Sequence, residues 1–404
     1  MKKGIIIIAT VALFGVLIQG GINLAAGSTT AEYSELSDGA KQLIAKAYKD
    51  LDQNQLIDFH THIAALGTDC NYCYVNKNMM KPTHIKSYVQ FKVYAKASGI
   101  RNLETADQQF FSTLQERVAD YPGKVMLLAF DETYSRAGIV DKGATQFYIS
   151  NEYMYRLYLQ DTSKFIPCVS IHPYRKDAVD ELRYWAGKGV KVVKWLPNAM
   201  LINPSDSICM PFYQAMAMNG MALLTHAGHE DAVHADDSQA LGNPLLLRQA
   251  LDQGVKVVVA HCASSGESID LDDPKETLVS NFDLLLRMMN EEQYDSLLFA
   301  DISAMTLRNR VGEPLRKVLE NPQIHNRLIN GSDYPLPAIN VLISTRKLYN
   351  EGYLTNQEHK QLDEIYQYNP LVFDFVLKRT IRHPENNKLK FADEVFEMNQ
   401  KLEL

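Results

Sequence analysis

The stretch Leu56-Ile57-Asp58-Phe59-His60-Thr61-His62 decides the fold, because a short apolar run in it leads directly into two histidines. Residues two apart on an extended strand point to the same side, so both imidazoles can bind one ion. Histidine is the commonest metal ligand near neutral pH. A His-x-His pair also arises by chance, so its meaning depends on whether further ligands follow at later strand ends.

Seven more short apolar runs follow, and each is typical of a strand buried on both faces. Amphipathic stretches of helical length separate most of them, for example 177–188 and 211–219, which end at Gly189 and Gly220. Eight strands alternating with helices predict a (β/α)8 TIM barrel, with an insertion or lid within 63–124. A doubly wound open sheet is the alternative, but its usual Gly-rich first turn is missing. The eight runs are 56–59, 125–130, 165–171, 190–195, 221–225, 256–260, 297–300 and 328–330.

The N-terminus has the composition of an export signal. Lys2 and Lys3 precede the apolar run 5–18, and Ala25-Ala26-Gly27 offers small residues for cleavage before Ser28. The run is shorter than the roughly 20 residues of a membrane-spanning helix. We therefore expect a signal peptide or membrane anchor over 1–27, a helical lead-in over 28–55 and the barrel over 56–404. The protein is expected to be exported, periplasmic or secreted, with an inner-membrane anchor as the alternative to cleavage.

The composition argues against one class of partner and leaves the role of the cysteines undecided. The chain of 404 residues is 46% hydrophobic and carries a net charge of −7, which argues against a nucleic-acid partner. Cys70 and Cys73 form a single CxxC motif, without the second one that a four-thiolate zinc site needs. A local disulfide, a redox pair and an incidental role all remain open for this pair. The sequence indicates no oligomeric state.

Polar residues gather just past the carboxyl ends of the predicted strands, where barrels build their active sites. A single histidine at a strand end is more often a hydrogen-bonded surface or core residue. The combined pattern, in barrel order, instead predicts a metal site at one rim. The residues are His60 and His62 from strand one, His172 from strand three, Lys194 from strand four, His226 from strand five, His261 from strand six, Asp301 and Ser303 from strand seven, and Asp333 from strand eight.

With these residues in order, the chain resembles the amidohydrolase superfamily, and in particular its amidohydrolase-related (amidohydrolase 2) branch. The resemblance covers about residues 56–378. The segments that carry it are Asp58-Phe59-His60-Thr61-His62, Lys194-Trp195-Leu196-Pro197, Leu224-Thr225-His226-Ala227-Gly228, Ala260-His261-Cys262-Ala263, Gly331-Ser332-Asp333-Tyr334-Pro335 and Asn369-Pro370.

The resemblance implies a role for each matching residue. His60 and His62 would bind a first metal ion, with Asp333 as its carboxylate ligand and the acceptor of a proton from water. His226 would be a further ligand. His261 would bind a second ion or act as an acid, a base or a polarising group. Lys194 would bridge two ions if carboxylated, or else contact substrate or support the structure.

The implied activity is metal-dependent hydrolysis of an amide, ester or lactone bond in a small molecule. Histidine and carboxylate ligands suit zinc, with manganese and iron as alternatives. A decarboxylase or lyase of the same superfamily and a non-catalytic binding barrel are the competing hypotheses. His172, Trp195 and Tyr334 are candidate substrate contacts, with packing as the alternative. Arg308 and Arg310 are expected to be solvated or salt-bridged, with anion binding as the alternative.

Overall fold

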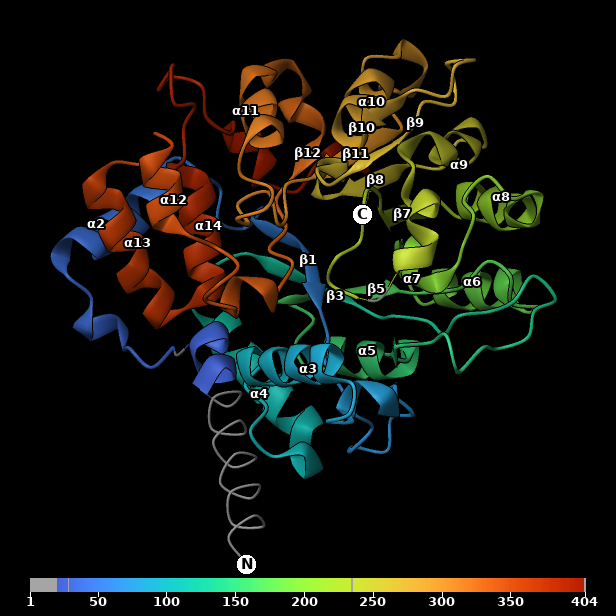
Figure 1. Ribbon diagram of the computed structural model, residues 1–404, viewed down its shortest axis with the longest axis horizontal. Helices are drawn as coiled ribbons and strands as arrows, with labels where there is room; N and C mark the ends of the chain where they lie inside the picture. Colours follow the sequence, from blue (N-terminus) through green and yellow to red (C-terminus); the bar gives the residue numbers. More distant parts are fainter. Residues whose placement is uncertain (1–19, 28, 234, 403–404) are drawn as a thin grey trace, which may run out of the picture.

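Eight parallel strands form one sheet at the centre of the molecule, with helices around them (Figure 1). The computed structural model describes residues 20–27, 29–233 and 235–402. The strands follow one another around the sheet in sequence order. They are β1 (Ile57–His62), β3 (Lys124–Leu128), β5 (Phe165–Val169), β6 (Val192–Trp195), β7 (Ala222–His226), β8 (Val257–Ala260), β11 (Leu298–Asp301) and β12 (Leu328–Ile329).

The sheet closes on itself. Phe59 N donates to Asn330 O at 2.9 Å, and His62 N donates to Tyr334 O at 2.9 Å, so the first strand pairs with the chain that leaves the last. A parallel bridge joins Thr61 and Tyr334. Closure with eight parallel strands confirms the predicted (β/α)8 barrel and excludes the open sheet.

Each strand alternates between two apolar environments, as expected of strands buried on both faces. One set of side chains fills the barrel lumen, and the other packs against the surrounding helices. Gly189 and Gly220 end the predicted helices with positive φ angles of 85° and 60°. The lumen set contains Ile57, Phe59, Met126, Leu128, Cys168, Val192, Leu224, Val258, Ala260, Phe299 and Ile329.

The helices are short and mostly follow the strands. The predicted helices 177–188 and 211–219 correspond to α6 and α8. Helix α6 is one residue shorter at each end than predicted, and α8 begins and ends one residue earlier. The helices are α2 (Asp38–Tyr48), α3 (Ile85–Ala97), α4 (Ala106–Ala119), α5 (Asn151–Tyr158), α6 (Ala178–Gly187), α7 (Pro197–Met200), α8 (Met210–Met218), α9 (Arg248–Asp252), α10 (Asn281–Met289), α11 (Glu313–Glu320), α12 (Thr345–Asn350), α13 (Asn356–Tyr368) and α14 (Pro370–Thr380).

A β-bulge interrupts β1 immediately before the two histidines. Asp58 pairs with Val125, whereas Thr61 pairs with Leu127, so β1 uses one residue more than β3 over this step. Strict alternation would place His60 on the face of Asp58, which is opposite to the lumen residue Phe59. The bulge changes that parity, because an extra residue re-aims the side chains that follow it.

The insertion predicted within 63–124 is present as helix α3, which precedes α4. Its Gln90 side chain donates to Ala232 O in the loop after β7, so α3 lies over the rim at the carboxyl ends of the strands. The antiparallel pair of β2 (Tyr74–Val75) and β4 (Phe147–Tyr148) links the same insertion to the loop after β3.

The lead-in helix and the last two helices pack against one another. Helix α2 of the lead-in packs against α13 and α14. Asn369 caps the start of α14, because its Oδ1 accepts from Leu371 N at 2.9 Å.

Among the described residues, no helix is both long and apolar enough to cross a membrane. Most of the predicted signal or anchor, residues 1–19, lies outside the described residues. All five cysteines are free thiols, and Cys70 is exposed.

Candidate metal centre

Three histidines and one carboxylate converge at the carboxyl ends of the strands. The Nε2 atoms of His60 and His62 lie 3.2 Å apart. Asp333 Oδ1 lies 3.2 Å from His62 Nε2 and 3.6 Å from His60 Nε2, while its Oδ2 lies 3.7 Å from His261 Nε2. Asp333 therefore stands between the pair on β1 and the histidine after β8, with one oxygen facing each side.

The backbone holds two of these residues in an uncommon conformation. Asp333 has φ of 60° and His261 has φ of 56°, in the left-handed region where residues other than glycine are rare. Asp333 N donates to His60 O at 2.7 Å, and His261 N donates to Asp301 Oδ1 at 2.9 Å. These bonds tie both turns to neighbouring strands, so the surrounding structure supports the local strain.

Asp301 and Ser303 orient the histidines from behind. His60 Nδ1 lies 2.8 Å from Asp301 Oδ2, and His261 Nδ1 lies 2.7 Å from Ser303 Oγ. The Ser303 hydroxyl donates to Asp301 Oδ1, which leaves its oxygen free to accept from His261. Both imidazoles then carry their proton on Nδ1 and present an Nε2 lone pair to the centre, as in metal sites with a carboxylate behind the ligand.

His226, on β7, completes the ring of histidines. Its ring centroid is 5.4 Å from that of His261, and its buried Nε2 has no hydrogen-bond partner among the described residues. Its Nδ1 lies 3.5 Å from Glu230 Oε2. A buried polar atom without a partner costs free energy. The Nε2 lone pair of His226 is therefore available to bind a metal ion.

Lys194 lies inside the same cluster. Its side chain is buried, and Nζ lies 3.2 Å from His60 Nε2. Burial lowers the pKa of Lys194, and the carboxylates of Asp301 and Asp333 only partly oppose this effect. A larger fraction of the amine is therefore neutral than in an exposed lysine.

Burial keeps His60, His226 and His261 neutral, and the groups around Asp333 keep its carboxylate charged. Burial lowers the pKa of His226 to about 3 and also holds the pKa values of His60 and His261 well below the usual range. Burial alone would raise the pKa of Asp333, but His60 and the other nearby groups outweigh it and lower that pKa to about 2. At neutral pH the cluster therefore offers lone pairs and a negative charge, which is what a divalent cation requires.

The spacing of the donor atoms fits a metal ion. Two nitrogens each about 2.0 Å from a tetrahedral zinc lie about 3.3 Å apart, and the Nε2 atoms of His60 and His62 are 3.2 Å apart. Donor atoms of His60, His261 and Asp333 all lie within 4.8 Å of one another. The residues present therefore fit a divalent cation, and the unpartnered Nε2 of His226 supports the same conclusion.

The candidate substrate contacts lie elsewhere. Trp195 is fully buried between the strand and α8, and its Nε1 donates to Ile171 O at 2.8 Å. Tyr334 is also fully buried and lies near Phe110 of α4. His172 Nε2 donates to Met200 O at 2.9 Å, and its Nδ1 accepts from Tyr174 N at 3.1 Å. The structure gives all three residues packing or backbone partners and does not bring them into the histidine cluster.

The two arginines after β11 differ sharply. Arg308 is exposed, as expected, whereas Arg310 is buried. The Arg310 guanidinium donates to Ser264 Oγ at 3.0 Å. Its Nε has no hydrogen-bond partner, and Arg310 forms no ion pair within the described part of the chain. The expectation that Arg310 is solvated or salt-bridged was therefore wrong, because the turn after His261 and the loop after β11 enclose its guanidinium.

Glu230 was not recognised in the sequence. It lies four residues after His226 in a loop, where its Oε1 accepts from Ala232 N and from Val233 N at 3.0 Å. Burial raises the pKa of Glu230 to about 7 despite these bonds. A single acidic residue in a loop has no sequence signal for such burial, so only the structure reveals its contact with His226.

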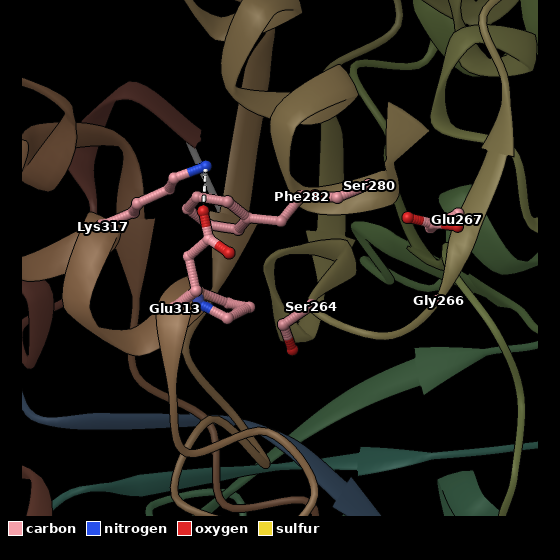
Figure 2. Close-up of a pocket in the computed structure, with 8 residues that line it drawn as sticks. Ser264, Gly266, Glu267, Ser280, Phe282, Glu313 and Lys317 are labelled. Carbon is pink, nitrogen blue, oxygen red and sulfur yellow. Dashed lines mark ion pairs between the residues drawn. The ribbon is translucent and has the colours of Figure 1, made fainter. Parts of the chain in front are cut away.

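A separate cavity of about 220 Å³ lies outside the metal centre (Figure 2). Ser264 lines it from the turn after β8, and Glu313 and Lys317 of α11 form an ion pair of 2.8 Å across one side. None of the residues that line it belongs to the histidine cluster, so this cavity is not the candidate metal site.

Comparisons with known proteins identify similar barrels. No family model matches the chain, and no curated protein does. Matching structures include an uncharacterized TIM-barrel protein from Bordetella bronchiseptica (14% identity, 79% of this chain and 99% of that one, TM-score 0.49). Others are a putative 2-pyrone-4,6-dicarboxylic acid hydrolase from Pseudomonas putida (16%, 70% and 83%, 0.41) and 5-carboxyvanillate decarboxylase from Sphingomonas paucimobilis (12%, 86% and 97%, 0.46).

Proposed function

We propose that this protein is a metal-dependent hydrolase that cleaves an amide, ester or lactone bond of a small molecule. The observation that carries the proposal is the position of Asp333, whose two oxygens lie 3.2 to 3.7 Å from the Nε2 atoms of three histidines. A carboxylate at the centre of a buried imidazole cluster can serve both as a ligand and as a proton acceptor.

In this proposal His60, His62, His226, His261 and Asp333 would hold one or two ions. A divalent cation bound there, zinc being the best match to these ligands, supplies Lewis acidity and makes water a nucleophile at neutral pH. Asp333 accepts a proton from the attacking water at one carboxylate oxygen and returns it to the leaving group. His261 presents its Nε2 lone pair 3.7 Å from Asp333 Oδ2, so it would serve as a further ligand of that cation.

Metal analysis tests the proposal most directly. We expect protein purified without chelator to contain one or two divalent ions per chain, and to lose hydrolysis of a panel of esters, amides and lactones after chelation and regain it with zinc or manganese. Carbon dioxide release from unsaturated or aromatic acids would instead identify a decarboxylase. A chain that binds none of these ions would be a non-catalytic barrel and would contradict both enzyme proposals.

Replacement of Lys194 by alanine is expected to lower the metal content from two ions to one. The amine can add to carbon dioxide to form a carbamate with loss of a proton, which converts a repelling cation into an anionic ligand. Short carboxylates such as acetate are then expected to restore part of the metal content. Lys191→Ala is the control, because Lys191 is exposed on the same segment. Two ions retained at full affinity in Lys194→Ala would exclude the bridge.

Replacement of Arg310 by methionine is expected to raise KM about 10- to 100-fold for substrates that carry a carboxylate, with little change for neutral ones. A buried guanidinium without an anionic partner is costly, and a charge-assisted hydrogen bond contributes about 1.5–3 kcal/mol. Arg308→Met is the matched control, because Arg308 is exposed two residues away. Equal KM changes for charged and neutral substrates would assign Arg310 a structural role.

We also propose that the protein is exported. The paired lysines and apolar run that precede residue 20 support this location. Among the described residues, the structure adds that the chain just after this run packs against the barrel. Ile22 and Ala26 are each only 3% exposed.

A further inference from the structure

The segment that contains α3 carries only one sign of charge. Residues 70–103 include five lysines and one arginine but no aspartate or glutamate, although the whole chain has a net charge of −7. A run of one sign within a chain of the opposite sign indicates an interaction surface for a charged partner. The basic residues are Lys77, Lys81, Lys86, Lys92, Lys96 and Arg101.

Four of these six cations have no acidic partner. Lys77, Lys81 and Lys86 are exposed, and no ion pair involves them or Lys92 in the described ranges. Lys92 Nζ lies 5.6 Å from the centroid of the Tyr88 ring. We call Lys77, Lys81, Lys86 and Lys92 the basic segment. It adds no internal stabilisation through salt bridges, so its charges are available to an external partner.

Apolar side chains are exposed within the same segment. Ile85, in the first turn of α3, is 54% exposed, and Tyr72 is 86% exposed. Exposed apolar side chains beside lysines suit contact with a surface that is anionic at its headgroups and apolar beneath them. The inner side of α3 is instead committed to the protein, because Phe91 and Ala95 are buried.

The N-terminal segment reaches the barrel beside α3. Lys96 Nζ donates to Asn23 Oδ1 at 2.7 Å, which joins α3 to the helix over 20–26 (Figure 1). Asn340 Nδ2 donates to Leu24 O at 3.5 Å on another side of that helix. The apolar run 5–18 therefore precedes a turn of chain that is packed next to the basic segment.

We propose that the basic segment docks on an anionic phospholipid surface, on the side of the barrel where α3 contacts the helix over 20–26. Each lysine near an anionic leaflet contributes about fivefold to the docked state at moderate salt. This surface is independent of the proposed chemistry at the metal centre.

A lipid surface explains the observations better than a nucleic acid does. The rest of the chain is acidic and would repel an extended polyanion. A flat bilayer meets only the face that lies against it and also accepts exposed apolar residues such as Ile85. Docking there would place α3, whose Gln90 contacts the rim loop at Ala232, between the membrane and the metal centre.

Fluorescence quenching in vesicles tests this proposal with the full chain. The two native tryptophans are buried, at 1% and 0% exposure, so Ile85→Trp adds a reporter in α3 over a protected background. We expect a lipid with a headgroup quencher to quench this reporter in vesicles that contain phosphatidylglycerol and much less in phosphatidylcholine alone. About 1 M salt, where the Debye length is about 3 Å, is expected to abolish the difference.

Four lysine substitutions provide the decisive comparison. In the Ile85→Trp background, Lys77→Gln, Lys81→Gln, Lys86→Gln and Lys92→Gln together are expected to lower the docked-to-undocked ratio by about a hundredfold or more. The control is replacement by glutamine of Lys191, Lys275, Lys388 and Lys390, which are exposed elsewhere. Quenching that is independent of phosphatidylglycerol, or unchanged by the four substitutions, would overturn the proposal. Binding of soluble heparin without lipid-dependent quenching would overturn it in favour of another polyanion.

Discussion

Asp333→Asn is expected to lower kcat by about three orders of magnitude while leaving the barrel folded. The substitution keeps the size of the side chain and the bond from residue 333 N to His60 O, which measures 2.7 Å. It removes the negative charge that faces three imidazoles and the oxygen that accepts the proton. General acid–base groups contribute roughly 10²- to 10⁴-fold. Steady-state kinetics on the substrate found in the hydrolysis panel would measure the loss.

Two companion variants separate the possible origins of that loss. Asp301→Asn changes a carboxylate that contacts His60 through Nδ1 at 2.8 Å, so it is expected to weaken metal binding about 10- to 100-fold, as other carboxylates behind ligands do. Asp231→Asn alters an exposed acid near the same rim and is expected to change neither property. A kcat of Asp333→Asn within tenfold of the wild type, at saturating metal, would contradict the role of Asp333.

The barrel and the positions of its candidate metal ligands could be predicted, because both depend on patterns visible in short stretches of the sequence. Strands buried on both faces must be apolar, so each of the eight strands appears as a compact hydrophobic run. Because parallel strands end at one rim, polar residues at those ends must meet there. His60, His226, His261 and Asp333 were predictable together for this reason, although each alone resembles an ordinary polar residue.

What the sequence did not reveal depends on backbone detail and on loops. Strict alternation places His60 on the side of Asp58, and only the bulge in β1 turns it toward the centre. Arg310 and Glu230 lie in loops, where no periodicity predicts burial. Their side chains are enclosed by segments from other parts of the chain, such as the turn that carries Ser264. Such contacts are set by tertiary packing, which local patterns do not encode.

Tertiary packing also sets a buried ion pair near the turn that carries Asp333. Breaking this pair is expected to cause a large loss of stability. Lys378 of α14 is fully buried, and its Nζ donates to Asp374 Oδ2 and to Gly331 O, each at 2.6 Å. Gly331 lies two residues before Asp333, so this lysine supports the turn that carries the carboxylate. Asp58, whose pKa burial raises, also lies in the field of Lys378.

Lys378→Met is therefore expected to destabilise the protein by about 3–5 kcal/mol, because removal of one partner leaves Asp374 buried without its counter-charge. Urea unfolding followed by the fluorescence of the buried tryptophans would measure the loss. Adding Asp374→Leu is expected to recover much of it, since an apolar pair can replace a buried ion pair, but not all, because Asp58 still lacks a cation. Lys347→Met, which breaks an exposed pair of 3.6 Å with Glu351, is expected to cost less than about 1 kcal/mol. Equal losses in Lys378→Met and Lys347→Met would show that the buried pair does not support the turn that carries Asp333.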